Sequence, residues 1–223
     1  MELILKHKHP LAIRWFHWIN FPVLALMIAS GLLIYWANDV YSVRIGGWTL
    51  FHFFPEWFYQ RFNIGQRLAE GMAWHFLSMW IFAINGVAYV LYTALSGEWR
   101  SLLPNRHSFA EAIQVTLHDL GLRKEPLPER KFNGAQQIAY TAVVLMGFGS
   151  LLTGLAIYEP VQFGWLTQAL GGYQWARFQH FWLTIGYVLF FMVHVAQVIR
   201  AGWNNFRSMV VGYEVAEVEE QPR

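Results

Sequence analysis

Four histidines inside long apolar runs are the residues of this sequence best suited to bind a metal: His17, His75, His180 and His194. His180 and His194 share one run and are 14 residues apart. On a helix this offset is about 21 Å of rise and brings both imidazoles to within about 40° of one face. Ionisable groups inside membrane-length segments are rare and usually functional. The pattern indicates binding sites at two depths.

Uncharged runs at residues 15–38, 71–97, 132–158 and 178–199 are each long enough to cross a bilayer, for which about 20 residues suffice. Only 13% of the residues are charged, against roughly 25% in soluble domains. We therefore predict an all-α membrane protein, a bundle of four transmembrane helices with interfacial helices in the connecting loops. The expected spans are about 12–37, 71–96, 134–158 and 177–201, within one domain (1–211) followed by an acidic cytoplasmic tail (212–223). We identify no internal repeat.

The distribution of basic residues predicts the orientation. Four spans place both termini and the middle connection on one side, which holds 12 of the 16 Lys and Arg residues. The positive-inside rule makes that side cytoplasmic. Because the basic residues are scattered at span ends and the net charge is only +2, we expect the lipid bilayer and no nucleic acid as a partner.

Alternating span direction assigns each histidine a depth. His17 lies toward the cytoplasm, His75 and His180 toward the outside, and His194 toward the cytoplasm again. Depth alone therefore pairs His75 with His180 and His17 with His194. Histidines that only pack helices together, or relay protons in a transporter, are the alternative.

Two imidazoles from different helices suit the two axial positions of a haem iron. Zinc and copper sites need three or four ligands close together. The chain has no cysteine, which excludes covalent c-type haem and thiolate-held clusters. We therefore expect two haem b groups, with His17, His75, His180 and His194 as metal ligands. A bis-imidazole iron has no open position, which favours electron transfer over oxygen chemistry.

Two glycine and two arginine residues near these histidines could each have one of two roles. Gly31 and Gly86 would leave room beside a macrocycle, or allow close helix packing. Arg14 and Arg177 each precede a histidine by three residues. Each could bind a haem propionate as part of the cofactor site, or anchor its span at the membrane surface.

Several segments together resemble the bacterial cytochrome b561 and nickel–iron hydrogenase-type cytochrome b family, which includes formate dehydrogenase gamma and thiosulfate reductase cytochrome b subunits. They are residues 14–18, 132–137 and 177–181, with His75 and His194. The resemblance covers about residues 9–206. It implies a four-helix di-haem bundle in the bacterial cytoplasmic (inner) membrane, with a quinone site beside the inner haem.

The amides of Asn133 and Gln136 are the candidates for that quinone site, for menaquinone or ubiquinone. The formate dehydrogenase branch has an Asn-x-Gly-Gln turn before the third span. The segment 133–136 matches its Asn and Gln and shifts the glycine. Asn133 is also suited to cap the third helix, and both roles are compatible.

The resemblance implies a transmembrane electron-transfer subunit of a quinone-linked respiratory oxidoreductase, with no catalytic residues of its own. Its partner would be a periplasmic redox subunit, of molybdopterin type rather than a hydrogenase. A stand-alone cytochrome b561 quinone oxidoreductase and the cytochrome b subunit of a nickel–iron hydrogenase remain alternatives. The aromatic connection at 39–70 would serve as an interfacial anchor or a docking surface.

Overall fold

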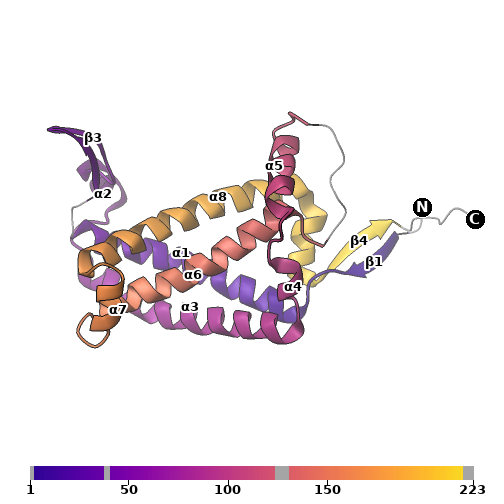
Figure 1. The fold of residues 1–223 in the computed structure, drawn as a ribbon, viewed down its shortest axis with the longest axis horizontal. Coiled ribbons are helices and arrows are strands. Elements are labelled where there is room, and N and C mark those ends of the chain that lie inside the picture. Colours follow the sequence, from indigo (N-terminus) through magenta and orange to yellow (C-terminus); the bar gives the residue numbers. More distant parts are fainter. Residues whose placement is uncertain (1–2, 38–40, 124–130, 218–223) are drawn as a thin grey trace, which may run out of the picture. The chain divides into compact units, whose positions relative to one another are not determined.

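The structure, a computed structural model, describes residues 3–37, 41–123 and 131–217. Its four long helices are α1 (Leu11–Trp36), α3 (Leu68–Ser96), α6 (Gly134–Tyr158) and α8 (Tyr173–Val211), drawn in Figure 1. All four are long and apolar enough to span a membrane. The expected helical membrane fold is confirmed. Helix α8 continues beyond the expected span to Val211, through a break at Gly202, whose φ of 81° is not helical.

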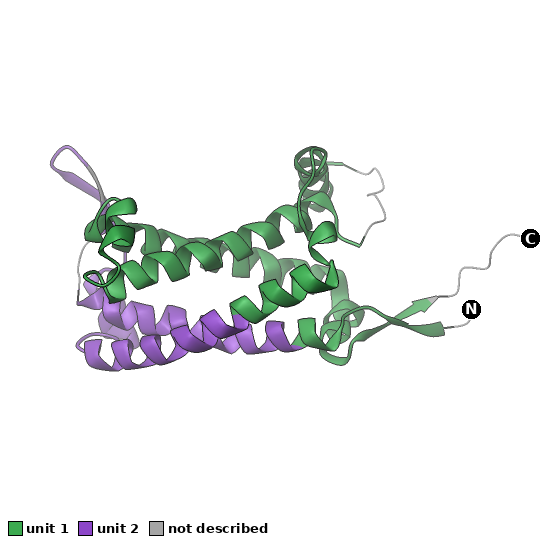
Figure 2. Ribbon diagram, turned by 60° about the horizontal axis from the view of Figure 1, so that its bottom comes forward, with its two compact units in different colours: residues 1–14, 86–223 green, residues 15–85 purple. Residues whose placement is uncertain are grey.

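The chain divides into two compact units, coloured separately in Figure 2. One comprises residues 15–85 and the other residues 1–14 with 86–223. In the unit 15–85, helices α1 and α3 run antiparallel. Asn85 Nδ2 donates a hydrogen bond to Phe16 O (3.0 Å) at one end of the pair, and Ser30 meets His75 at the other. A Cβ added to Gly71 would lie 2.7 Å from Leu33 Cβ, so glycine is needed for this close approach.

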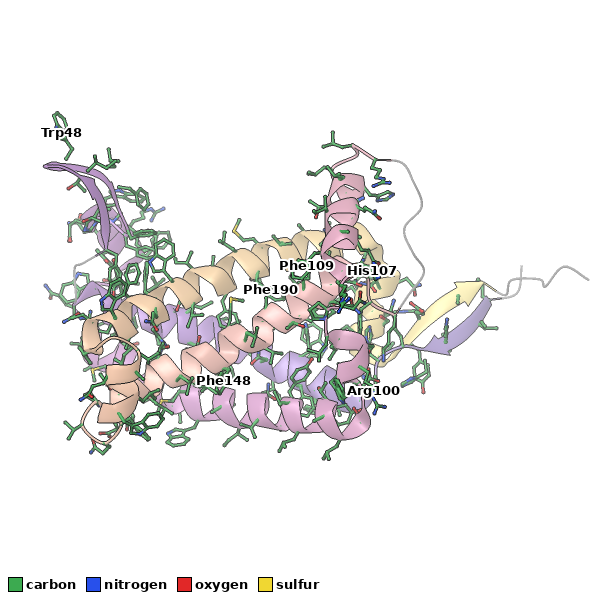
Figure 3. All side chains as sticks on the ribbon, in the orientation of Figure 1. Trp48, Arg100, His107, Phe109, Phe148 and Phe190 are labelled. Atoms are coloured by element: carbon green, nitrogen blue, oxygen red, sulfur yellow. The ribbon has the colours of Figure 1, made fainter. Side chains whose placement is uncertain are left out.

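The connection between α1 and α3 differs from the expectation of interfacial helices alone. It forms a hairpin of β2 (Ser42–Ile45) and β3 (Trp48–His52), followed by one helix, α2 (Glu56–Phe62). Gly46 and Gly47 make the turn, with Gly46 at φ 60°. A Gly-Gly pair between short apolar runs is a hairpin signal, which the interpretation as an interfacial helix overlooked. Trp48 projects at the far end of the hairpin and is 80% exposed (Figure 3).

In the other unit, α6 and α8 pack together and the shorter helices cover their ends. Ala156 and Ala176 are fully buried where α7 (Gly164–Ala169) closes one end, and Thr167 Oγ1 donates to Ala156 O (3.1 Å). Helices α4 (Trp99–Leu102) and α5 (Ser108–Asp119) lie at the N-terminal end of α6. There the buried Gln137 accepts a hydrogen bond from Ser108 Oγ (2.6 Å). The connection between α3 and α6 therefore contains the helix expected near residues 109–120.

The expected solvated tail is partly ordered. Strand β4 (Tyr213–Glu217) pairs antiparallel with β1 (Leu3–His7), and Lys8 Nζ lies 2.6 Å from a Glu214 carboxylate oxygen. Gly212, at φ 93°, ends α8 and turns the chain into this pairing. Residues 218–223 of the tail lie outside the described residues.

Short parts of the two helix pairs correspond, a partial repeat that our reading of the sequence missed. Residues 30–35 read SGLLIY and residues 153–158 read TGLAIY, an offset of 123. In the second helix of each pair the offset is 105, which aligns His75 with His180 and Gly97 with Gly202. Both of these glycines have positive φ. The segment that joins the helices is thus 18 residues shorter in the second copy, so the repeat has no constant period.

Candidate functional site

His75 is held by a hydroxyl group from the neighbouring helix. Its Nδ1 lies 3.0 Å from Ser30 Oγ, and Ser30 is 1% exposed. The single hydrogen of that hydroxyl goes to the carbonyl of Leu26 (2.7 Å), one turn back along α1. The oxygen must therefore accept from the ring, so Nδ1 carries the hydrogen. In this tautomer the lone pair is on the other ring nitrogen, Nε2.

His180 is held in the same way in the other unit. Its Nδ1 lies 2.9 Å from Thr153 Oγ1, and Thr153 is 2% exposed. The hydroxyl donates to the carbonyl of Gly149 (2.7 Å). By the same reasoning the ring is protonated on Nδ1 and presents the Nε2 lone pair. A histidine whose one nitrogen is engaged and whose other is basic has the form of a metal ligand.

A glycine follows each hydroxyl residue and faces the imidazole. A Cβ added to Gly31 would lie 3.7 Å from His75 Cε1, and one added to Gly154 would lie 3.5 Å from His180 Cε1. A methyl group would just fit, but any larger side chain would reach the ring. Gly31 therefore lies at the level where we expected it to leave room. A Cβ at Gly86 would meet nothing within 4 Å among the described residues.

The other two histidines lie at the opposite ends of their helix pairs. His17 follows Phe16, whose carbonyl binds Asn85, and its ring meets Trp18 edge-on at 5.0 Å between centroids. His194 stacks on Phe190 at 5.7 Å, with an angle of 10° between the ring planes. Within each unit, then, the structure places two imidazoles at the two ends of one helix pair.

The repeat assigns a tyrosine as the counterpart of each of these histidines. Tyr140 aligns with His17, and Tyr89 aligns with His194. Each copy therefore has one histidine toward each end of its own helix pair.

The two candidate arginines lie at the ends of α1 and α8. Arg14 donates to Val210 O (2.6 Å) near the C-terminal end of α8. Arg177 donates to Gln174 Oε1 (3.2 Å) and lies over the Tyr173 ring at 5.9 Å. Both arginines are placed where they could anchor their helices at the membrane surface. Binding of a haem propionate by either arginine stays a prediction.

The two candidate amides form the N-terminal cap of α6. Asn133 Oδ1 accepts from the Gln136 backbone N–H (2.9 Å), and Gln136 Oε1 accepts from the Asn133 backbone N–H (3.0 Å). This capping box uses the two side-chain oxygens. The amide NH₂ groups are not part of it.

The donor set fits haem better than a bare metal ion. Among residues 3–37, 41–123 and 131–217, no three His, Asp or Glu side chains gather as they do in zinc or calcium sites. What the structure offers is single imidazoles, of which His75 and His180 each have a hydroxyl at Nδ1 and a glycine beside the ring. Sequence reasoning singled out the histidines and Gly31 but not Ser30, Thr153 or Gly154. The Ser-Gly and Thr-Gly pairs of the repeat were the signal that could have found them.

Two comparisons with known proteins bear on this site. The sequence model of the prokaryotic cytochrome b561 family matches residues 8–212, a range that includes all four histidines. A protein of Azospira oryzae named "Putative protein-methionine-sulfoxide reductase subunit YedZ1" is 30% identical over 191 residues, which are 85% of this chain and 89% of that protein.

Proposed function

The chain belongs to the prokaryotic cytochrome b561 family, and from that premise we propose that it is a two-haem subunit linking a periplasmic oxidoreductase to the membrane quinone pool. Family membership makes the chain a multi-pass membrane protein that carries out cytochrome b561-type electron transfer. It also implies that the chain binds haem b. The number of haems, their ligands, the quinone and the partner are the proposal. A haem with two imidazole ligands supplies one-electron transfer without an open coordination position.

In this proposal His75 and His180 hold the outer haem, and His17 and His194 hold the inner one. The observation that carries it is the pair of hydroxyl–imidazole bonds, which give His75 and His180 the same tautomer with a basic Nε2. The repeat adds support, because each copy contributes one imidazole at each level. The apolar helices exclude water from the ligands, and Gly31 and Gly154 leave space at the ring edges.

The inner haem faces the cytoplasm in this proposal. The excess of Lys and Arg around both termini and the middle connection supports this orientation in the bacterial inner membrane. Quinone binds at the same end, where the NH₂ groups of Asn133 and Gln136 donate to a quinone carbonyl while their oxygens cap α6. Menaquinone and ubiquinone both have the carbonyl that this requires.

The partner is a redox protein on the periplasmic side, of molybdopterin type rather than a nickel–iron hydrogenase. The name of the Azospira relative, which describes a reductase subunit, favours a subunit over a stand-alone quinone oxidoreductase. The exposed aromatic side chains of the β2–β3 hairpin and α2, such as Trp48 and Trp57, are available for docking. The same aromatic side chains are also suited to anchor this segment at the lipid interface.

Purification from membranes tests the proposal. We expect b-type bands in the reduced-minus-oxidised spectrum, two haems per chain, and a second subunit that co-purifies. His180→Ala is expected to remove the outer haem and retain the inner one, and His194→Ala the reverse. A protein without haem, or one in which either substitution removes the haem assigned to the other, would show that the ligand assignment is wrong.

A further inference from the structure

Two hydroxyl groups contact the outer-level histidines in a way that packing alone does not require. A serine or threonine in a membrane helix can satisfy its hydroxyl by donating to a carbonyl one turn back. Ser30 and Thr153 both do so, and each also approaches an imidazole Nδ1 from the neighbouring helix. It is this second bond that needs an explanation.

We infer that Ser30 and Thr153 are positioning residues, which fix the tautomer and the ring orientation of His75 and His180 and thereby set the redox potential of the outer haem. The inference rests on the proposed ligand roles of these histidines. It concerns the bond on the side of each ring that faces away from the iron.

The hydrogen bonds of the two hydroxyls to their own helix favour the tautomer with the ring hydrogen on Nδ1. Besides its bond to the carbonyl at i−4, each hydroxyl has a second carbonyl within reach, Met27 O at 3.1 Å from Ser30 and Ser150 O at 3.3 Å from Thr153. Both carbonyls can only accept, so the hydroxyl hydrogen has acceptors on its own helix and is not needed for a bond to the ring. Donation to Nδ1 would break the bond to the carbonyl and would place the ring hydrogen on Nε2, where it would block the iron.

The chemistry of the acceptor predicts the direction of the effect. A ring N–H that donates a hydrogen bond makes the imidazole a more electron-rich ligand, which stabilises the ferric state and lowers the potential. Because a hydroxyl is a neutral acceptor, it should lower the potential less than a negatively charged carboxylate would. Removing the acceptor should therefore raise the potential of the outer haem.

The repeat argues that the arrangement is not incidental. The two copies agree in the acceptor oxygen, the carbonyl at i−4 and the Nδ1 distance, 3.0 Å in one and 2.9 Å in the other. Both hydroxyl residues are almost completely buried, and each is followed by the glycine that faces the ring. In the segments 30–35 and 153–158 the hydroxyl is kept although serine has become threonine.

The test replaces the acceptors in the purified, haem-loaded chain by Ser30→Ala and Thr153→Val, singly and together. Redox titration of the b-type bands gives both midpoint potentials, and the electron paramagnetic resonance signals of the low-spin ferric haems report ring orientation. We expect each variant to raise the potential and change the signal of the outer haem, with the inner haem unchanged. The double variant should shift the potential further than either single variant, because both ligands act on the same haem.

Matched controls separate this role from a general loss of packing. Ser30→Thr and Thr153→Ser keep the hydroxyl and should keep the wild-type potential. Thr184→Val removes a hydroxyl one turn from His180 that donates to the His180 carbonyl (3.1 Å), and it should leave both potentials unchanged.

The remaining outcomes either support or overturn the positioning role of Ser30 and Thr153. Unchanged outer potentials in Ser30→Ala and Thr153→Val with both haems bound overturn the inference, as does an equal shift in Thr184→Val. If Ser30→Ala or Thr153→Val loses haem, recovery of haem by the hydroxyl-retaining variant supports the inference and failure to recover overturns it. Wild-type protein without haem would refute the proposed function instead.

Discussion

Gly154, the glycine beside His180, provides a direct test of the space that the proposed outer haem site requires. A Cβ at Gly154 would lie 3.5 Å from His180 Cε1, an ordinary contact distance, so Gly154→Ala should bind both haems. Valine adds γ-methyl groups one bond further out, about 1.5 Å. A methyl directed at the ring would then come within roughly 2 to 2.5 Å of it, where carbon atoms normally stay about 3.5 to 4.0 Å apart.

The size of the effect of Gly154→Val follows from this overlap. Valine in a helix has essentially one favoured rotamer, so rotation offers little relief and the imidazole must move. Overpacking of this kind costs about 1 to 3 kcal/mol. If the cost falls on the haem-bound state, affinity for the outer haem drops about 5- to 150-fold.

Haem titration of the purified variants measures this directly, with the two haems distinguished by their midpoint potentials. We expect Gly154→Val to lose outer haem selectively and Gly154→Ala to retain it. Gly164→Val is the matched control, because a Cβ there would meet nothing within 4 Å among the described residues. Wild-type affinity in Gly154→Val, or equal loss of both haems, would refute the reasoning.

Three further predictions follow from other parts of the fold. Asn133→Ala should slow quinol oxidation while both haems are retained. Loss of the helix cap should also lower the free energy of unfolding by about 1 kcal/mol. Unchanged quinone kinetics in this variant would reject the contact between Asn133 and quinone. Gly71→Ala should lower the thermal unfolding temperature, followed by circular dichroism, because its Cβ would lie 2.7 Å from Leu33 Cβ, with an overpacking cost of about 1 to 3 kcal/mol. Burial, reinforced by the charge of Lys8, lowers the pKa of His9. The stability of the β1–β4 sheet should therefore be fully present above about pH 6.5 and fall as the pH drops through that value. Amide exchange of residues 3–7 at pH 7.5 and 5 measures this, and His9→Gln should abolish the pH dependence.

The spans could be predicted from the sequence because a bilayer fixes the length and polarity of a helix that crosses it. The four helices follow from uncharged runs, and no tertiary contact is needed to find them. The cap of α6 was foreseeable for a similar reason, since Asn133 and Gln136 satisfy backbone groups three residues apart.

The features that could not be predicted depend on contacts between distant segments. Strand β4 exists because Gly212 returns the chain to residues 3–7, and the acidic composition of the tail pointed instead to solvent. Ser30 and Thr153 are common residues in membrane helices, and only the neighbouring helix distinguishes them from ordinary polar positions. The unequal connections concealed the repeat, which would otherwise have linked the two hydroxyls in advance.

The repeat also distinguishes the two ends of the helix pairs. At the end that holds His75 or His180 both copies are alike, since the first helix of each supplies a hydroxyl and the second supplies the histidine. At the other end the first copy has its histidine on the first helix, His17, whereas the second copy has it on the second helix, His194. Tyr140 and Tyr89 fill the remaining positions.

This difference fits the proposed division of labour. An outer haem that only passes electrons to a protein partner needs two well-held ligands, and two equivalent ones suffice. An inner haem that serves quinone must also have a side where a quinone ring can bind and exchange protons. In the proposed arrangement, the departure from the repeat would make the surroundings of the inner haem unequal. The side chains at the positions without imidazoles, Tyr89 and Tyr140, are phenols, which can donate hydrogen bonds. If quinone is oxidised or reduced at this end, substitution of Tyr89 or Tyr140 by phenylalanine should alter quinone kinetics and leave the outer potential unchanged.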